Sequence, residues 1–117
     1  MSLMCDTLKM EVRTRILKPF VTIDGKCPYN EWFLDLKDMK TQALVDARLT
    51  RLRQGNPGKF RSVGRGVKEL KIDYGPGYRI YFAEENETIV ILLCAGDKKT
   101  QTKDIQKAQK LWAEYLR

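Results

Sequence analysis

Histidine is absent from this 117-residue sequence. The absence excludes an imidazole general base, the Ser-His and Cys-His pairs of covalent catalysis, and any histidine-ligated metal site. Acid-base chemistry would have to use Lys, Arg, Tyr, Asp or Glu side chains. We therefore expect neither a metal ion nor another cofactor.

Cysteine is also scarce, and long apolar runs are missing. Cys5, Cys27 and Cys94 are odd in number and include no Cys-x-x-Cys spacing, so neither a disulfide framework nor a zinc ribbon is expected. A reducing cytoplasm is the expected compartment. No apolar run approaches the ~18 residues that a membrane span needs, and the N-terminus lacks the apolar core of a signal peptide.

The length predicts a single domain. Residues 1–117 are enough for an ordinary hydrophobic core without support from disulfides or metals. Met1-Ser2-Leu3 precedes a second methionine, and we interpret it as a cloning leader that does not belong to the fold.

The charge balance is strongly positive. Lys and Arg number 22 against 15 Asp and Glu, which gives a formal net charge of +7 and a pI near 9.4. Such a charge favours an anionic partner, with nucleic acid first and an acidic protein second. The same charge is also compatible with a merely soluble surface rich in lysine.

Residues 67–99 predict three consecutive antiparallel strands at the centre of the fold. In the first strand, apolar and charged residues alternate with a period of two. The apolar set is Leu70, Ile72 and Tyr74, and the charged set is Glu69, Lys71 and Asp73. Gly75-Pro76-Gly77 then turns the chain, because glycine tolerates positive φ and proline fixes its own φ.

The second strand brings further polar residues to the face opposite the core. Tyr78, Ile80 and Phe82 lie on one face of this strand, and Arg79 and Tyr81 lie on the other face. If the apolar sets of both strands meet on the buried face, Arg79 and Tyr81 converge with Lys71 and Asp73 on the other face. We therefore predict an exposed, cationic surface that carries an aromatic side chain and suits an anionic partner.

The third strand, at residues 88–95, is apolar almost throughout. Such a run predicts an interior strand that is buried on both faces. Gly96-Asp97-Lys98-Lys99 follows it and places two cations at its exit.

The flanking segments predict one more strand and three helices. They are an edge strand at residues 9–17, a helix at 28–40, a helix at 41–53 capped by Thr41, and a helix at 100–117. Residues 59–66 are interpreted as a basic connection, in which Gly64-Arg65-Gly66 is only a weak phosphate-loop signal. The expected fold is α+β in the order β-α-α-β-β-β-α, with an antiparallel sheet, a helical hairpin and a C-terminal helix.

Two long motifs resemble a known family. They are E-L-K-I-D-Y-G-P-G-Y-R-I-Y-F at residues 69–82 and I-V-I-L-L-C-A-G-D-K-K-T-Q-T-K-D-I-Q-K-A at 89–108. Both resemble the phage-derived killer proteins of addiction modules, which are HigB-like members of the RelE/ParE toxin superfamily. The resemblance extends back through P-Y-N-E-W-F-L-D-L-K-D and N-P-G-K-F, so it covers Pro28 to the C-terminus.

The resemblance implies a RelE/ParE-like fold and the toxin of a type II toxin–antitoxin module. Such a toxin forms a hetero-oligomer with a helix-turn-helix antitoxin, a segment of which we expect to cover the cationic face. RelE-type members cut mRNA on the translating ribosome by attack of the ribose 2′-hydroxyl on the phosphodiester. ParE-type members share the fold and act on DNA gyrase.

The resemblance also implies roles for individual residues. Arg79 stands where the superfamily has its phosphate-binding arginine, Lys71 lies close to a strand lysine of the nuclease members, and Lys98 matches the basic residue after the last strand. The implied catalytic set is Lys71, Arg79, Tyr81 and Lys98. The implied RNA-binding set is Arg61, Arg65, Asp73, Lys99 and Lys103.

Three hypotheses about function remain open. The first is a metal-independent, ribosome-dependent endoribonuclease, in which Lys71 is a candidate base and Tyr81 an acid or a stacking surface. The second is a noncatalytic gyrase inhibitor, because histidine is absent and Lys103 stands near where nuclease members commonly place Tyr or His. The third is a module that has lost toxicity. Lys71 and Asp73 could also simply pair on an exposed sheet face.

Overall fold

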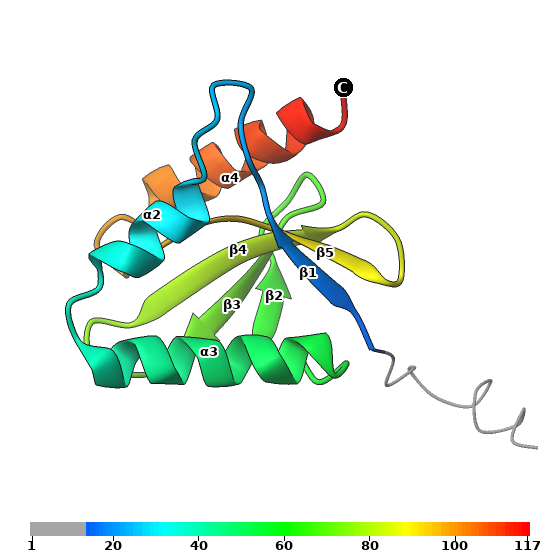
Figure 1. The fold of residues 1–117 in the computed structure, drawn as a ribbon. Helices are drawn as coiled ribbons and strands as arrows, with labels where there is room; N and C mark the ends of the chain where they lie inside the picture. The colour runs from blue at the N-terminus through cyan, green and yellow to red at the C-terminus, as the bar shows by residue number, and fades with distance from the viewer. Residues whose placement is uncertain (1–13) are drawn as a thin grey trace, which may run out of the picture.

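The computed structural model describes residues 14–117, which form a mixed α+β fold. The expectations for Met1-Ser2-Leu3, for Cys5 and for the first part of the strand at 9–17 lie outside the described residues. The elements are β1 Ile16–Pro19, α2 Pro28–Asp35, α3 Met39–Arg53, β2 Phe60–Ser62, β3 Lys68–Ile72, β4 Tyr78–Glu84, β5 Ile89–Gly96 and α4 Gln101–Tyr115. The five strands make one sheet in the order β1-β5-β4-β3-β2, with helices on both faces (Figure 1).

The predicted three-strand centre is confirmed. β3 pairs antiparallel with β4, and β4 pairs antiparallel with β5. β5 lies between β1 and β4, as its continuous apolar sequence predicts. An irregularity in the pairing at Tyr81 and Phe82 lets both Leu93 and Cys94 pack in the cluster on the α4 side of the sheet.

Two parts of the predicted topology are wrong. The sheet is not wholly antiparallel, because β1 pairs parallel with β5 from Ile16 opposite Ile89 to Pro19 opposite Leu92. Between β1 and β5 the chain passes through α2, α3, β2, β3 and β4, and this long connection allows it to return in the same direction. The segment predicted as a basic connection also contains a fifth strand, β2, whose three exposed residues are too few to show an alternating pattern. The observed order is therefore β-α-α-β-β-β-β-α.

The helix limits differ from the prediction, and α2 ends at Asp35 rather than at residue 40 because the backbone is extended at Leu36. α3 begins at Met39, and its cap is Asp38 rather than Thr41, because the Asp38 carboxylate accepts hydrogen bonds from the Lys40 N–H (3.1 Å) and the Thr41 hydroxyl (2.7 Å). α2 and α3 both cover one face of the sheet, where α2 packs on β5 and α3 on β3.

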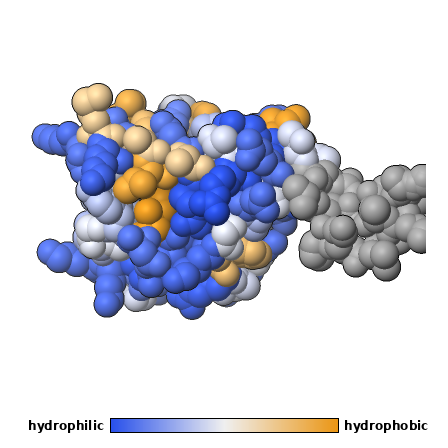
Figure 2. Space-filling model, turned by 90° about the horizontal axis from the view of Figure 1, so that it is seen from below, coloured by the Kyte–Doolittle hydropathy of each residue, from blue (hydrophilic) through white to orange (hydrophobic). Residues whose placement is uncertain are grey.

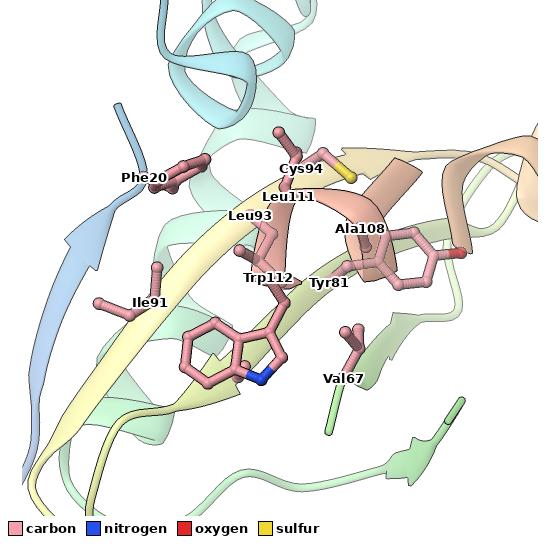
Figure 3. Packing of buried hydrophobic residues seen from close by; sticks show 10 residues of the cluster. Phe20, Val67, Tyr81, Ile91, Leu93, Cys94, Ala108, Leu111 and Trp112 are labelled. Atoms are coloured by element: carbon pink, nitrogen blue, oxygen red, sulfur yellow. The ribbon is translucent and has the colours of Figure 1, made fainter. Parts of the chain in front are cut away.

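The core consists of two clusters, one on each face of the sheet. The cluster under α2 and α3 contains the apolar residues of β3 and β4 that the alternation predicts to be buried: Leu70, Ile72, Ile80 and Phe82. The cluster under α4 is shown in Figure 3, where Tyr81 lies with Val67, Leu93, Ala108 and Trp112. The face predicted to be exposed is thus covered by α4 over much of its area.

The outer side of the molecule near α3 is shown from below in Figure 2. This face is largely hydrophilic, and hydrophobic residues gather in its left half. Leu34 and Met39, which flank the connection between α2 and α3, are 76% and 82% exposed. None of the helices in residues 14–117 combines the length and the apolar character that crossing a membrane requires.

The start of α4 is held tightly against the end of β5. A Cβ atom at Gly96 would fall onto the carboxylate of Asp104, so glycine is required here for the close approach. The Thr100 hydroxyl donates a 2.5 Å hydrogen bond to the same carboxylate. This packing places Gln101, the first residue of α4, over β3 and β4.

Candidate functional site

Lys71 and Arg79 are direct cross-strand neighbours on the α4 side of the sheet. Arg79 is only 6% exposed, and its Nη1 donates a 2.8 Å hydrogen bond to the carbonyl oxygen of Gly77. Its Nε is buried without a hydrogen-bond partner and lies 3.8 Å from Oε2 of Glu69. The Arg79 guanidinium is therefore held between the Gly77 carbonyl oxygen and the Glu69 carboxylate.

Two hollows meet at this pair of residues. The first, which we name the inner hollow, has a volume of about 290 Å³ and is lined by Lys59, Phe60, Arg61, Glu69, Lys71, Arg79 and Gln101. The second, named the turn hollow, has a volume of about 340 Å³ and is lined by Lys71, Asp73, Tyr74, Gly75, Pro76, Gly77, Arg79 and Lys98. Lys71 and Arg79 form the wall that the two hollows share.

Lys98 completes the cluster from the exit of β5. It lines the turn hollow with Lys71 and Arg79, and its Cβ lies 4.0 Å from the position that a Cβ at Gly77 would take. The same position is 3.1 Å from Arg79 Nη1. The structure therefore brings together Lys71, Arg79 and Lys98, three of the four residues predicted to be catalytic.

Tyr81, the fourth, is placed differently from the prediction. Its side chain is fully buried beneath α4, and its hydroxyl donates a 2.9 Å hydrogen bond to Glu69. Burial, followed by the hydrogen bond to Glu69, raises the pKa of the Tyr81 hydroxyl well above its ordinary value. Because it is buried, Tyr81 offers neither a stacking surface nor an accessible acid. The prediction failed because the alternation of residues places Tyr81 on the face opposite to that of Leu70 and Ile80 but does not show that a helix covers that face.

Glu69 is the functional candidate that the sequence analysis missed. It is 2% exposed and accepts hydrogen bonds of 2.9 Å from Arg61 Nε, the Tyr81 hydroxyl and Gln101 Nε2. Burial alone would raise the pKa of Glu69, but the hydrogen bonds from Arg61, Gln101 and Tyr81 together lower it below its ordinary value. Glu69 is therefore an ionised anchor for the cations around it. Glu69 lies two residues before Lys71 in β3 and therefore on the same face of the strand, which is the signal that could have identified it.

Asp73 is tied to two lysines. Its carboxylate lies 3.1 Å from Lys59 Nζ and 3.4 Å from Lys71 Nζ. Hydrogen bonds from Lys59 and Lys71 lower the pKa of Asp73. The pairing of Lys71 with Asp73, which the sequence left open, is thus present, and it would compete with a bound anion for Lys71.

The remaining predicted RNA-binding residues divide into two groups. Arg61 lines the inner hollow, where it pairs with Glu69. Arg65 instead lies in the turn between β2 and β3 with φ of 57°, and the adjacent Gly66 faces Trp112 of α4. Lys99 and Lys103 are exposed and line neither hollow.

The inner hollow is rich in positive charge. The inner hollow has four cationic side chains against one carboxylate, and an arginine fork can contact two oxygens of one phosphate. Within the described residues, no three His, Cys, Asp or Glu side chains gather closely enough to hold a metal ion.

Comparison with known proteins gives a family match and one similar sequence. Residues 31–113 match the family described as "Phage derived protein Gp49-like (DUF891)". A Haemophilus influenzae protein described as "Uncharacterized protein" is 46% identical over 94 residues, which cover 80% of this chain and 95% of that protein. No solved structure matches the chain.

Proposed function

Because the chain belongs to the Gp49-like family of phage-derived proteins, a family associated with toxins of toxin–antitoxin modules, we propose that it is the toxin of a type II module and cuts mRNA on the translating ribosome. In this proposal it is a HigB-like protein with a RelE/ParE-like fold. It acts in the cytoplasm without a metal ion and is held inactive in a hetero-oligomer with a helix-turn-helix antitoxin.

The observation that supports this proposal most is the meeting of Lys71, Arg79 and Lys98 around the two hollows. Cleavage of RNA by its own 2′-hydroxyl puts extra negative charge on the phosphate in the transition state. Fixed positive groups at that position lower the barrier, because they need no rearrangement as the charge develops. Arg79 is the candidate for this role, since it lines both hollows and a guanidinium can contact two oxygens of one phosphate.

The reaction also needs two proton transfers. The 2′-oxygen forms a bond to phosphorus while the bond from phosphorus to the 5′-oxygen breaks, which leaves a 2′,3′-cyclic phosphate and a free 5′-hydroxyl. Lys71, as the neutral amine, is the candidate to accept the 2′-hydroxyl proton, and Lys98, as the ammonium ion, is the candidate to donate a proton to the leaving oxygen. Glu69 acts as a positioning residue that holds Arg61 and Arg79 beside the phosphate.

The test is cleavage of mRNA in purified ribosome complexes. We expect the protein to cut mRNA and leave 2′,3′-cyclic phosphate ends, and Arg79→Lys to cut at least tenfold more slowly because lysine lacks the arginine fork. Arg65→Lys is the matched control, since Arg65 lies outside both hollows, and it should cut at the normal rate. Arrested translation with intact mRNA would reject the nuclease proposal.

A second candidate is a noncatalytic inhibitor of DNA gyrase. The burial of Tyr81 supports it, because in a chain without histidine this removes one of the few groups that could transfer a proton. Inhibition of supercoiling by the protein and equally by Arg79→Lys would favour this function. If neither mRNA cleavage nor gyrase inhibition occurs, and induction leaves growth unchanged, the module has lost its toxicity.

A further inference from the structure

β2 lies at an open edge of the sheet. It pairs with β3 on one side, and no strand among residues 14–117 pairs with its other side. All three of its residues, Phe60 to Ser62, are exposed. An open edge presents unpaired N–H and C=O groups, which can add a strand from another polypeptide.

The pairing with β3 shows which backbone groups point outward. Lys59 accepts a hydrogen bond from the Lys71 N–H, and Val63 donates to the Val67 carbonyl oxygen. In an antiparallel pair, residues that bond to the neighbouring strand alternate with residues that do not. Since residues 59 and 63 bond toward β3, residue 61 does so too, and Phe60 and Ser62 direct their N–H and C=O groups away from the sheet.

One side of this edge carries a mostly apolar hollow, in which the charged residues Arg15 and Lys68 both pair with Glu84. This hollow of about 350 Å³, which we name the edge hollow, is lined by Arg15, Leu52, Gly55, Pro57, Phe60, Lys68, Phe82 and Glu84. Phe60 is 43% exposed, and it is the register partner of Leu70, whose side chain belongs to the cluster under α3. The Phe60 side chain therefore lies on the α3 side, where an apolar side chain of a partner could cover it.

The other side of the edge is cationic. Arg61 is the register partner of Glu69 and lines the inner hollow, together with Lys59 and Arg79. A strand added beside β2 would point its side chains alternately to the two sides. Its chemistry should then alternate as well, with apolar residues toward the edge hollow and acidic residues toward Arg61.

We propose that β2 is the docking edge for a partner segment of alternating apolar and acidic residues, which adds as a sixth strand. The identification of this partner as the antitoxin rests on the proposed function, whereas the docking edge itself rests on the geometry of β2. A second copy of this chain is disfavoured, because the same cations would face one another across the edge. An acidic side chain next to Arg61 would also compete with a phosphate, so docking should weaken anion binding.

The first test uses an eight-residue peptide of alternating valine and glutamate, compared with a peptide of the same composition in two blocks. NMR titration of the full chain should show tighter binding of the alternating peptide, with the largest shifts at the Phe60 and Ser62 amides. Equal binding of the two peptides, or shifts only elsewhere, would overturn the proposal.

A pair of variants at Ser62 tests the edge directly. Proline is tolerated at an edge position whose N–H faces solvent, but it removes the outward donor. Ser62→Pro should keep the fold and lose at least tenfold in affinity for the alternating peptide, whereas Ser62→Ala should bind normally. Normal binding by a folded Ser62→Pro protein would overturn the proposal. If Ser62→Pro does not fold, Phe60→Ala replaces it and should weaken binding of the alternating peptide.

Two further measurements test whether a different segment occupies the β2 edge. If a chain lacking residues 1–13 binds the peptide much more tightly than the full chain, the N-terminal segment itself competes for the edge and the assignment to a partner is overturned. A dimer in sedimentation that Ser62→Pro dissociates would identify a second copy instead. Peptide binding needs no ribosome, so a failure of mRNA cleavage leaves this result standing, and a failure of docking leaves the nuclease proposal standing.

Discussion

The two faces of the central sheet bury different chemistry. Under α2 and α3, the residues that β3 and β4 bury in the core are apolar, such as Leu70 and Phe82. Under α4, the same strands contribute Tyr81 to the core, and beside it the buried pair of Glu69 and Arg79. The comparison indicates that one face serves mainly stability, while the other also holds a set of charges at a fixed place.

The largest expected effect concerns the apolar face. Phe82 is 2% exposed, so Phe82→Ala should lower the free energy of unfolding by about 3–5 kcal/mol. Leu34→Ala, at a residue that is 76% exposed, should change it by no more than about 0.5 kcal/mol. Chemical denaturation measures both, and a loss below about 1 kcal/mol for Phe82→Ala would contradict the apolar-core description.

The polar face should respond less strongly. Glu69→Gln keeps the shape of the side chain but removes the charge that Arg61, Tyr81 and Gln101 contact, which should lower the free energy of unfolding by about 2–3 kcal/mol. Asp73→Asn, at an exposed pair, should cost much less, because solvent screens an exposed pair. Equal effects of the two variants in chemical denaturation would remove the distinction between a buried anchor and a surface ion pair.

The pH dependence of the free energy of unfolding should show the contribution of the Glu69 charge on the polar face. Hydrogen bonds outweigh burial and lower the pKa of Glu69 in the folded chain, so the unfolded chain takes up this proton at a higher pH than the folded one. The stabilisation is therefore full above the ordinary pKa of 4.5 and is lost as pH falls through the lower folded value. The difference in stability between the natural chain and Glu69→Gln should shrink on acidification, and a difference that grows would contradict this assignment. Other carboxylates contribute equally to both proteins.

The Asp73 variant, which should change stability little, should gain affinity for RNA. Asp73→Asn frees Lys59 and Lys71 from their common carboxylate. The variant should bind single-stranded RNA more tightly than the natural chain, with a steeper dependence on salt. Fluorescence anisotropy measures this, and weaker binding would instead support Asp73 as a direct RNA contact.

Much of the fold could be predicted from local patterns. Alternation identified the buried residues of β3 and β4, and the unbroken apolar run identified β5 as an interior strand. The parallel pairing of β1 could not be predicted, since it depends on a strand far away in the sequence. The strand β2 was missed because its three exposed residues show no alternating pattern. The start of α3 at Met39 was missed because residues 38–40 were assigned to the preceding helix.

The candidate site was also predictable only in part. Cross-strand register was enough to bring Arg79 beside Lys71, and the turn brought both near Lys98. The alternation of side chains along a strand shows which residues share a face, but it does not show whether a helix covers that face. Tyr81 and Glu69 were therefore expected at the surface, and α4 buries both.

The central claim is that Lys71, Arg79 and Lys98 form one anion site, and a matched pair of lysine variants tests it most directly. Lys98 and Lys103 are both exposed, but only Lys98 lines a hollow with Arg79. In a salt titration of single-stranded RNA binding, Lys98→Ala should make the slope of log K against log salt shallower by about 0.7, the value for one phosphate contact, and Lys103→Ala should leave the slope nearly unchanged. Equal slopes for the two variants would contradict the claim.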